Sequence, residues 1–421
     1  MSLRPLIAAC AVLLSASVAG AQEWPRFRGP NGSGPVAGAS FAGPVAAADV
    51  VWRQKLPGTG HSSPVAWADH VYVTAADADS GERWLVCLSA DTGKELWRHA
   101  AKFISHRTHR DNSFASATPA ADDLGAYVVF TSPQECLLAA VGHDGKERWH
   151  RSLGRFESQH GGGTSPTVIG DLVVLNLDQE AGESALKAFD RRTGAPVWSV
   201  AHRTTRKAAM STPAVWQPKG GAEQIVCTTW GGGIQGIDPK TGKAAWSAPD
   251  VFFSRPIGSP QFAGDLVIGV CGEGNGTRSL VAVRPDPTGA KPPAVAYKID
   301  QLGPHVPCPL VAGDRLVLLN DLGQLTVADV ATGNVRWSQK LGLPFYGSPV
   351  LAGDVLWAVS RSGTLVGLKL DAEVGKEIAR LELGGQSHAT PAIVGPRMFL
   401  RTTTEVICLK KQGPAAAAAA K

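Results

Sequence analysis

Residues 165–198 form the stretch SPTVIGDLVVLNLDQEAGESALKAFDRRTGAPVW, which decides the fold. Pro166 begins a short strand, where its missing N–H costs no ladder hydrogen bond. Residues 170–171 (GD) make a tight turn into LVVLNL, a strand expected to be buried on both faces. A polar loop, the strand ALKAFD, a second turn at residues 191–194 and a last strand carrying Trp198 follow. Four antiparallel strands joined by short turns predict one blade of a β-propeller.

The same unit recurs along the chain. A small residue followed by proline and a strand-like run occurs eight times, at intervals of 40 to 55 residues. A unit of this length cannot bury its own faces and must stack on its neighbours. Eight units therefore predict a ring of eight blades. The dipeptides are Ser63-Pro64, Thr118-Pro119, Ser165-Pro166, Thr212-Pro213, Ser259-Pro260, Cys308-Pro309, Ser348-Pro349 and Thr390-Pro391.

A glycine followed four residues later by tryptophan closes five of the units. Glycine allows the positive φ of the turn, and the indole is expected to fill the widening wedge between neighbouring blades. The units that begin at Ser259 and Ser348 lack this tryptophan, and Tyr297 is the candidate to replace it in the first of them. The tryptophans predicted to be structural are Trp52, Trp97, Trp149, Trp198, Trp246 and Trp337.

Trp52 indicates how the ring closes. It lies in VVWRQKL with no earlier strands of its own, whereas the last unit, residues 390–411, has three strands and no fourth. The simplest arrangement places residues 50–56 in the last blade as its outer strand. The sequence therefore predicts an all-β, eight-bladed β-propeller of four-stranded antiparallel blades, whose last blade is closed by an N-terminal strand.

The segments outside the propeller have their own signatures. Arg4, a short apolar stretch and the small residues that end at Ala21 are typical of a secretory signal, so we expect a periplasmic or secreted protein after cleavage near Ala21. The apolar stretch is too short to span a membrane. The expected organisation is a signal peptide at 1–21, an N-terminal extension at 22–49, the propeller at 50–410 and a low-complexity tail at 411–421.

Charge and cysteine content exclude several classes of protein. The formal net charge is +5 and no block of five like charges occurs, so nucleic acid is not an expected partner. Of the seven cysteines, Cys10 falls within the signal, although residues 7–10 also resemble a lipoprotein box. The other six form no CxxC or adjacent pair, which favours buried free thiols; one or two disulfides remain an alternative in an oxidising compartment.

Two motifs carry a resemblance to a known family. The pattern D-x-x-T-G-x-x-x-W, at residues 190–198 and 238–246, is similar to the tryptophan-docking repeat of the quinoprotein (PQQ-like) propellers. The segment WPRFRGPNGSG, at residues 24–34, resembles the mature start of secreted bacterial PQQ-like repeat proteins. This family includes both the outer-membrane assembly lipoprotein BamB and PQQ-dependent alcohol dehydrogenases. The resemblance, over roughly residues 24–410, therefore implies the fold and leaves the activity open.

The resemblance also states what an enzyme of this kind would need. It implies Ca²⁺ held by Glu, Asn and Asp, an aspartate base and an aromatic plane under the quinone, often with a disulfide between adjacent cysteines. This sequence has no adjacent cysteines, and no motif surrounds Asp111 or Asp178. Trp230 is the tryptophan in a loop between a second and a third strand, where it could stack on a cofactor. No cofactor is predicted, and PQQ with Ca²⁺ is the alternative.

Histidines and arginines gather in the segments that lead into the first strands. In a propeller these segments converge on one face around the central channel, together with the loops between second and third strands. Three interpretations compete: imidazoles that satisfy loop backbone groups, a funnel for an anionic or polar small ligand, and a metal site, for which no HxH or HExxH spacing exists. The candidate ligand-binding residues are His61, His109, Arg110, His160, Trp230, Arg255, His305, Tyr346 and His388.

Taken together, these patterns favour a monomeric, non-enzymatic binding or assembly scaffold similar to BamB. Its partner would be an envelope or secreted protein, or a polar small ligand, bound at the loop face rich in histidine and arginine. A PQQ-dependent dehydrogenase, or another enzyme that uses the same channel mouth, is the alternative.

Overall fold

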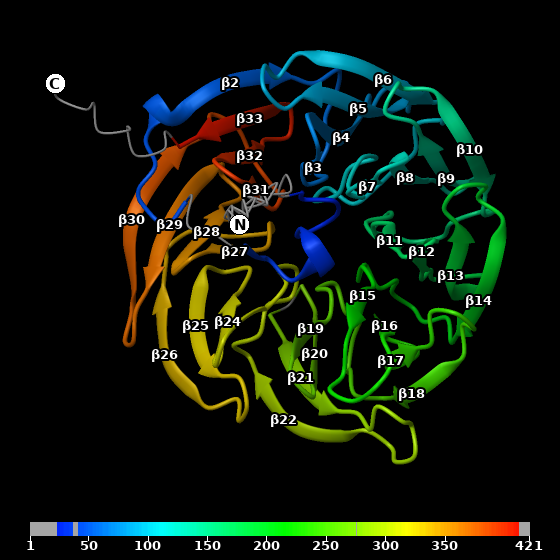
Figure 1. Ribbon diagram of the computed structural model, residues 1–421, viewed down its shortest axis with the longest axis vertical. Coiled ribbons are helices and arrows are strands. Elements are labelled where there is room, and N and C mark those ends of the chain that lie inside the picture. Colours follow the sequence, from blue (N-terminus) through cyan, green and yellow to red (C-terminus); the bar gives the residue numbers. More distant parts are fainter. Residues whose placement is uncertain (1–22, 37–40, 275, 412–421) are drawn as a thin grey trace, which may run out of the picture.

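The computed structural model describes residues 23–36, 41–274 and 276–411, so the predicted signal and all but the first residue of the predicted tail lie outside the described residues. The strands form eight sheets arranged as a ring around a central channel (Figure 1). Each sheet holds four antiparallel strands, with the first innermost and the fourth at the perimeter. The predicted eight-bladed propeller is confirmed. Among the described residues, no helix has the length and hydropathy to cross a membrane.

The first half of the ring contains blades 1 to 4. Blade 1 consists of β3 (Val65–Trp67), β4 (His70–Ala76), β5 (Arg83–Ser89) and β6 (Glu95–Ala101), and blade 2 of β7 (Ala120–Asp122), β8 (Gly125–Thr131), β9 (Cys136–Val141) and β10 (Glu147–Ser152). Blade 3 consists of β11 (Thr167–Ile169), β12 (Leu172–Leu177), β13 (Ser184–Asp190) and β14 (Pro196–His202), and blade 4 of β15 (Ala214–Trp216), β16 (Gln224–Thr229), β17 (Gly233–Ile237) and β18 (Ala244–Ala248).

The second half contains blades 5 to 8 and two short 3-10 turns, η1 (Pro30–Gly32) and η2 (Ala47–Asp49). Blade 5 consists of β19 (Gln261–Ala263), β20 (Leu266–Gly272), β21 (Arg278–Arg284) and β22 (Ala294–Asp300), and blade 6 of β23 (Leu310–Ala312), β24 (Arg315–Leu319), β25 (Gln324–Asp329) and β26 (Val335–Lys340). Blade 7 consists of β27 (Val350–Ala352), β28 (Val355–Val359), β29 (Thr364–Leu370) and β30 (Gly375–Glu382), and blade 8 of β31 (Ala392–Val394), β32 (Arg397–Arg401), β33 (Glu405–Lys410) and β2 (Val50–Lys55).

The ring closes as predicted, because β2 is the outer strand of blade 8. It pairs antiparallel with β33, and Trp52 lies opposite Cys408. In Figure 1 the blue β2 therefore runs beside the red β33. The sequence did not predict β1 (Pro35–Val36), which pairs parallel with β27 and gives blade 7 a fifth strand on its channel side.

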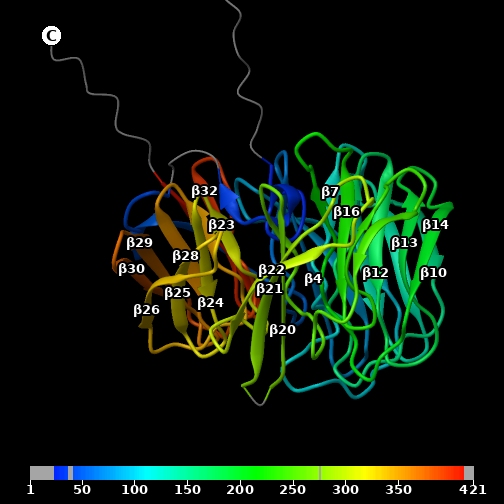
Figure 2. The same cartoon turned by 90° about the horizontal axis from the view of Figure 1, so that it is seen from below.

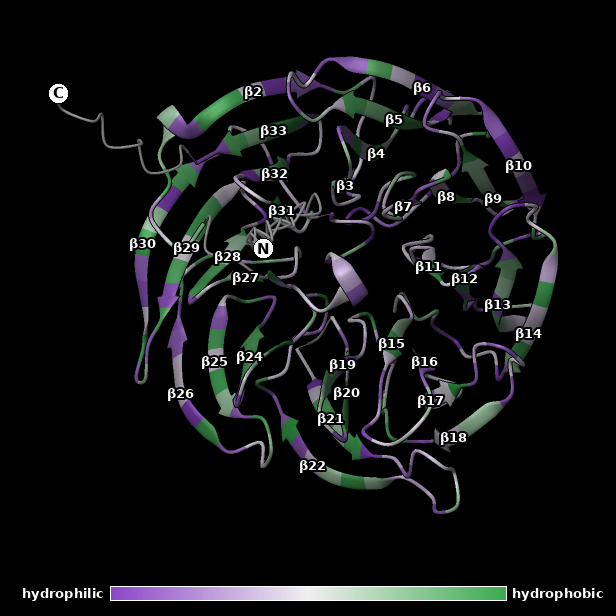
Figure 3. Ribbon diagram, viewed as in Figure 1, coloured by the Kyte–Doolittle hydropathy of each residue, from purple (hydrophilic) through white to green (hydrophobic). Residues whose placement is uncertain are grey.

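The core lies in the wedges between blades. The second and third strands are almost wholly buried, as in β20, whereas the fourth strands alternate between exposed and half-buried positions, as in β14. Figure 3 shows the same gradient, with green inner strands and mixed colours at the perimeter. One buried cluster, for example, joins Tyr127 and Leu138 of blade 2 to Phe189 of blade 3. Each blade is therefore stabilised by its neighbours, as expected for a repeat that cannot fold alone.

Four of the predicted tryptophans dock on the next blade in the same way. The indole of Trp149 covers Gly194 so closely that a Cβ atom there would lie 2.6 Å from the ring, and its N–H donates to the Arg191 carbonyl at 3.1 Å. Trp52, Trp97 and Trp198 repeat this arrangement on Gly93, Gly145 and Gly242. Tyr297 takes the same place above Gly333, and its hydroxyl donates to the Val330 carbonyl at 2.7 Å.

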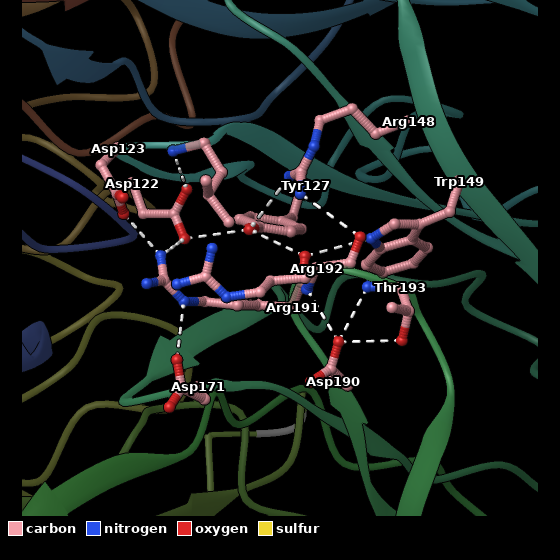
Figure 4. A network of polar contacts seen from close by, with 11 residues as sticks. Asp122, Asp123, Tyr127, Arg148, Trp149, Asp171, Asp190, Arg191, Arg192 and Thr193 are labelled. Carbon is pink, nitrogen blue, oxygen red and sulfur yellow. Dashed lines mark hydrogen bonds and ion pairs between the residues drawn. The ribbon is translucent and has the colours of Figure 1, made fainter.

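The other two tryptophans depart from this pattern. Both pack in clusters between blades, but the Trp246 N–H donates to Gln224 Oε1 of its own blade at 2.6 Å. Beside Trp337, it is Gln339 that reaches blade 7, with two hydrogen bonds to the Gly375 backbone. Ion pairs also connect blades 2 and 3, as Figure 4 shows. Arg191 of blade 3 pairs with two residues of blade 2, Asp122 at 2.7 Å and Asp123 at 2.5 Å.

Candidate functional site

The eight residues that precede the repeat prolines form a closed ring of hydrogen bonds around the channel. The backbone N–H of each donates to the side chain of its counterpart in the next blade, over distances of 2.9 to 3.4 Å. The last bond runs from the Thr390 N–H to Ser63 Oγ and closes the circle. At one place a thiol replaces the hydroxyl, since the Ser259 N–H donates to Cys308 Sγ at 3.1 Å. The ring explains why a small Ser, Thr or Cys precedes each proline.

The N-terminal segment 24–34, here called the plug, fills the channel on one side of this ring. Figure 2 shows it in dark blue near the upper end of the channel. Arg28 is fully buried and donates to the carbonyls of Gly32, Ser33 and Pro309. Hydrogen bonds connect the plug to the innermost strands, or the residues just before them, of seven blades, through the pairs Trp24–Ala66, Pro25–Ala121, Arg26–Thr167, Asn31–Val215, Gly32–Gln261, Arg28–Pro309 and Gly34–Leu351.

On the other side of the ring lies a blind cavity of about 470 Å³, here called the funnel. Phe27 of the plug and the ring residues form its floor, and the loops that lead into the first strands form its walls. Eight of the nine candidate ligand-binding residues come together here: His61, His109, Arg110, His160, Arg255, His305, Tyr346 and His388.

Trp230 does not line the funnel. It follows β16 and packs against the hydrophobic cluster between blades 4 and 5. Conversely, the funnel contains Phe27, Asp111 and Arg361, which were not among the candidate ligand-binding residues. The sequence held a weak signal for Asp111, which follows Arg110 in the same loop. Arg361 lies in the turn between β28 and β29, the kind of loop that converges on this face.

One wall of the funnel consists of mutually paired side chains. Asp111 accepts from Arg361 at 2.5 Å, and the Arg361 guanidinium lies 4.1 Å from the centre of the Tyr346 ring. The Tyr346 hydroxyl donates to the second carboxylate oxygen of Asp111 at 3.5 Å. His388 packs on Tyr346, and its ring lies 4.2 Å from that of His61. Because Asp111 comes from the loop between blades 1 and 2, this ion pair crosses the mouth of the funnel to blade 7.

The opposite wall carries polar atoms without partners. Arg255 is only 7% exposed, and its guanidinium makes no hydrogen bond or ion pair with any residue that the structure describes. His305 is 8% exposed, and its Nε2 atom has no partner among the described residues. The Nδ1 atom of His160 is also buried without a partner among the described residues, and so is the Nδ1 atom of His388 on the first wall. Buried polar groups are normally satisfied, so three such groups on one wall indicate a place where a ligand supplies the missing contacts.

The buried imidazoles are neutral at pH 7. Burial lowers the pKa of His61 to about 3 and the pKa values of His160, His305 and His388 to about 4. Nearby positive charge adds to this effect, from Arg255 on His160 and from Arg361 on His388. Each neutral ring offers one donor and one acceptor nitrogen. The funnel at neutral pH therefore presents hydrogen-bonding imidazoles and three arginines, with one aspartate that is already paired.

These residues do not fit the calcium-bound quinone that the resemblance to quinoprotein enzymes implied. Asp111 is the sole carboxylate in the funnel lining, and Arg361 occupies it. No tryptophan lines the cavity to support a quinone plane. Within the described part of the chain, no group of three or more His, Cys, Asp or Glu side chains is placed to hold a metal ion. The six cysteines among the described residues are all free and buried.

Comparison with known proteins assigns the family. The family model of the outer membrane protein assembly factor BamB matches residues 45–158, 81–251 and 279–369. The chain belongs to this family. Comparison with the curated proteins finds no match.

Solved structures of a BamB protein and of two dehydrogenases share the fold. BamB from Moraxella catarrhalis has a TM-score of 0.62 at 16% identity, over 86% of this chain and 99% of that one. A europium-containing methanol dehydrogenase has a TM-score of 0.66 at 12% identity, over 90% and 89%. The quinohemoprotein alcohol dehydrogenase from Comamonas testosteroni has a TM-score of 0.64 at 15% identity, over 94% and 81%. At these identities the likeness establishes the fold alone, so function depends on the site.

Proposed function

We propose that the protein is a non-enzymatic binding scaffold of the cell envelope, which receives an exposed polar segment of a partner protein in the funnel. Membership in the family of an outer membrane assembly factor supports this proposal. The observation that carries it is the plug, because residues 24–34 close the channel and leave a receptacle with one opening. The unpartnered groups on one wall give such a receptacle polar atoms with which to bind a partner, and the single carboxylate of the lining, Asp111, is already paired with Arg361.

The rim of the funnel supports a protein partner. Connections from fourth to first strands and turns between second and third strands lie on the funnel face. On them three large apolar side chains are exposed: Ile104 at 72%, Phe253 at 45% and Leu322 at 71%. Apolar anchors around a polar pocket are typical of protein–protein interfaces, in which a few large side chains supply most of the binding energy.

Site-directed photo-crosslinking in the intact envelope tests this function. A crosslinker next to the rim, for example at Arg107, should trap one partner, and the combined Ile104→Thr, Phe253→Thr and Leu322→Thr substitutions should remove most of that product. The matched control replaces Val51, Val197 and Val335, which are similarly exposed but lie on outer strands at the perimeter. The control should leave the product unchanged. Equal crosslinking by both triple variants would contradict the proposed docking face.

A second measurement addresses the enzyme alternative directly. Purified protein supplied with PQQ and Ca²⁺ should show no dye-linked alcohol oxidation, because the single carboxylate of the lining is already paired with Arg361 and no tryptophan lines the cavity. Sustained turnover would overturn the scaffold function in favour of a quinoprotein dehydrogenase.

A further inference from the structure

We infer that the unpartnered wall of the funnel is a carboxylate-binding subsite, in which Arg255 holds the anion and His160 and His305 bond to it. The inference rests on the proposed function, since it names the chemical group that the funnel receives. The carboxylate can belong to a chain terminus or acidic side chain of a partner, or to a small organic acid. The chemistry of recognition is the same for both sources.

Arg255 carries the argument because no described residue forms a hydrogen bond or ion pair with its guanidinium. The chain is fixed next to it by the hydrogen bond from the Met210 N–H to the Pro256 carbonyl. The guanidinium is buried, and its Nη1 atom has no partner among the described residues. The buried Arg28 of the plug differs, since it bonds to three carbonyls. An isolated buried charge costs several kcal/mol, which an incoming anion would recover.

The acids near Arg255 are already engaged elsewhere. Glu273 accepts from Lys207 Nζ and from the Ser254 hydroxyl, both at 3.1 Å. Glu180 accepts from the Ser158 hydroxyl at 3.3 Å and from the Gln159 N–H at 3.0 Å. Both carboxylates lie close enough to raise the pKa of Arg255, but neither bonds to it.

The remaining charge on this wall is balanced as well. Asp321 accepts from the N–H groups of His305 and Val306 at 2.8 and 3.0 Å, and it pairs with Arg278 at 3.4 Å. With Lys207 paired to Glu273, Arg255 is the cation of this wall that bonds to no described carboxylate, and the nearby Glu180 bonds only to neutral donors. One free guanidinium matches a monoanion, and its planar fork fits a carboxylate.

The two histidines complete the subsite. His160 Nδ1 and His305 Nε2 are buried without partners, and Arg255 lowers the pKa of both rings. His109 stacks beside His160, with 4.9 Å between the ring centres. A bound carboxylate would accept from these imidazoles and oppose the field of Arg255, so the pKa values of both histidines would rise from about 4. The complex would then hold more protons than the free protein, and affinity would strengthen between pH 7.5 and 5.5.

Titration of the full propeller, labelled with ¹³C in its histidine rings, tests the subsite. Propionate should shift the resonances of His160 and His305, and the isosteric neutral propionamide should not. Arg255→Gln should weaken the binding of propionate at least tenfold. Arg255→Lys keeps the positive charge but lacks the planar fork of the guanidinium, so its affinity for propionate should lie between those of the unaltered protein and Arg255→Gln. Arg98→Gln is the control, because this arginine lies on the outer strand β6, outside the funnel lining, and its side chain is 44% exposed; the affinity of this variant for propionate should stay within twofold. Equal binding of propionamide, or unchanged affinity in Arg255→Gln, would overturn the subsite.

Two peptide arms distinguish the sources of the carboxylate. A short peptide with a free C-terminus that binds more tightly than propionate, and loses this advantage when amidated, would assign the site to a partner's terminus. Equal affinities for peptide and propionate would assign it to a free acid. Photo-crosslinking at the rim separates the two proposals. If it fails while propionate still binds at Arg255, the scaffold function alone is wrong. If the partner still crosslinks but propionate does not bind, the subsite alone is wrong.

Discussion

The two ends of the central channel contain similar side chains in opposite states. At the plugged end, Arg28 is buried without an acid but bonds to three carbonyls. At the funnel end, Arg255 is almost as buried and bonds to no described residue. Between them lies the ring of hydrogen bonds made by the residues before the prolines. At the plugged end the chain's own backbone accepts from Arg28, although the Nε atoms of Arg26 and Arg28 have no partner among the described residues, whereas at the funnel end no described residue bonds to the Arg255 guanidinium.

Because of this difference, we expect the residues at the two ends of the channel to contribute differently to stability and to ligand binding. A group that the fold satisfies contributes to the free energy of unfolding, and its removal costs stability. A buried group that the fold leaves unsatisfied lowers stability and is tolerated where it serves another purpose. Changes at the plug and at the ring closure should therefore destabilise the protein, and changes at the funnel wall should mainly alter binding.

The largest effect is expected from shortening the chain. A protein that begins at residue 57 loses both the plug and β2, so blade 8 loses the strand that carries Trp52. Trp52 is half-buried, so its packing is worth at most about 3 to 5 kcal/mol, and an unpaired β33 would also be exposed. We expect this chain to lose cooperative thermal unfolding, as measured by calorimetry.

A chain that begins at residue 41 is the matched control, because it loses the plug and keeps β2. It should fold with a lower Tm than a chain that begins at residue 23, since hydrogen bonds to seven blades are gone. A chain from residue 57 that melts like the one from residue 41 would show that β2 does not close the ring.

The ring could be predicted from the sequence because the spacing of the repeated motif gives the length and number of the blades. Each blade contributes an independent copy of the pattern, so one ambiguous unit does not change the architecture. Trp246 shows the limit of prediction from the repeated motif. Its spacing from Gly242 is the same as in the other units, but its N–H bonds within its own blade because Gln224 offers a buried acceptor there. A local motif cannot indicate which of two acceptors is nearer in space.

The funnel was predictable only in part for the same reason. The residues on segments that lead into first strands were found, since chain position places them at the channel mouth. Phe27 and Arg361 were missed because their place depends on long-range contacts: the path of the plug, and a turn between second and third strands. The role of the Ser and Thr residues before the prolines was also hidden, because each hydrogen bond joins residues 40 or more positions apart.

An effect of intermediate size on stability is expected from a fall in pH, and it should arise from histidines at the funnel end of the channel. His61 and His388 have pKa values of about 3 and 4 in the folded protein, below the ordinary value of 6.5. The unfolded chain therefore binds more protons between pH 6.5 and 4, and stability falls as the pH drops through this window. The loss is on the order of 1 to 2 kcal/mol per imidazole at pH 5. Thermal unfolding at pH 7.5 and pH 5 measures it.

Replacement of these two histidines tests whether they cause the loss of stability in acid. The combined His61→Asn and His388→Gln substitutions should reduce the fall in Tm between pH 7.5 and 5. His150→Gln, on the outer strand β10, is the control and should leave the fall unchanged, because the His150 side chain is 59% exposed. An acid sensitivity that both variants retain in full would place its origin outside the His61–His388 pair.

The smallest effect is expected in the ring that separates the two ends. Cys308→Ser should change the free energy of unfolding by less than about 0.5 kcal/mol, because a hydroxyl can accept the Ser259 N–H as the thiol does. Cys308→Ala leaves this buried donor without a partner and should cost about 1 to 3 kcal/mol.

Cys136 provides the contrast: it lies in an apolar cluster, and burial raises its pKa to about 12. Cys136→Ser should therefore cost about 1 to 3 kcal/mol, because its hydroxyl would be buried in an apolar cluster. Urea denaturation of the three variants measures these differences. If serine and alanine at position 308 were equally tolerated, the ring would be a consequence of the propeller geometry and would contribute little to its stability.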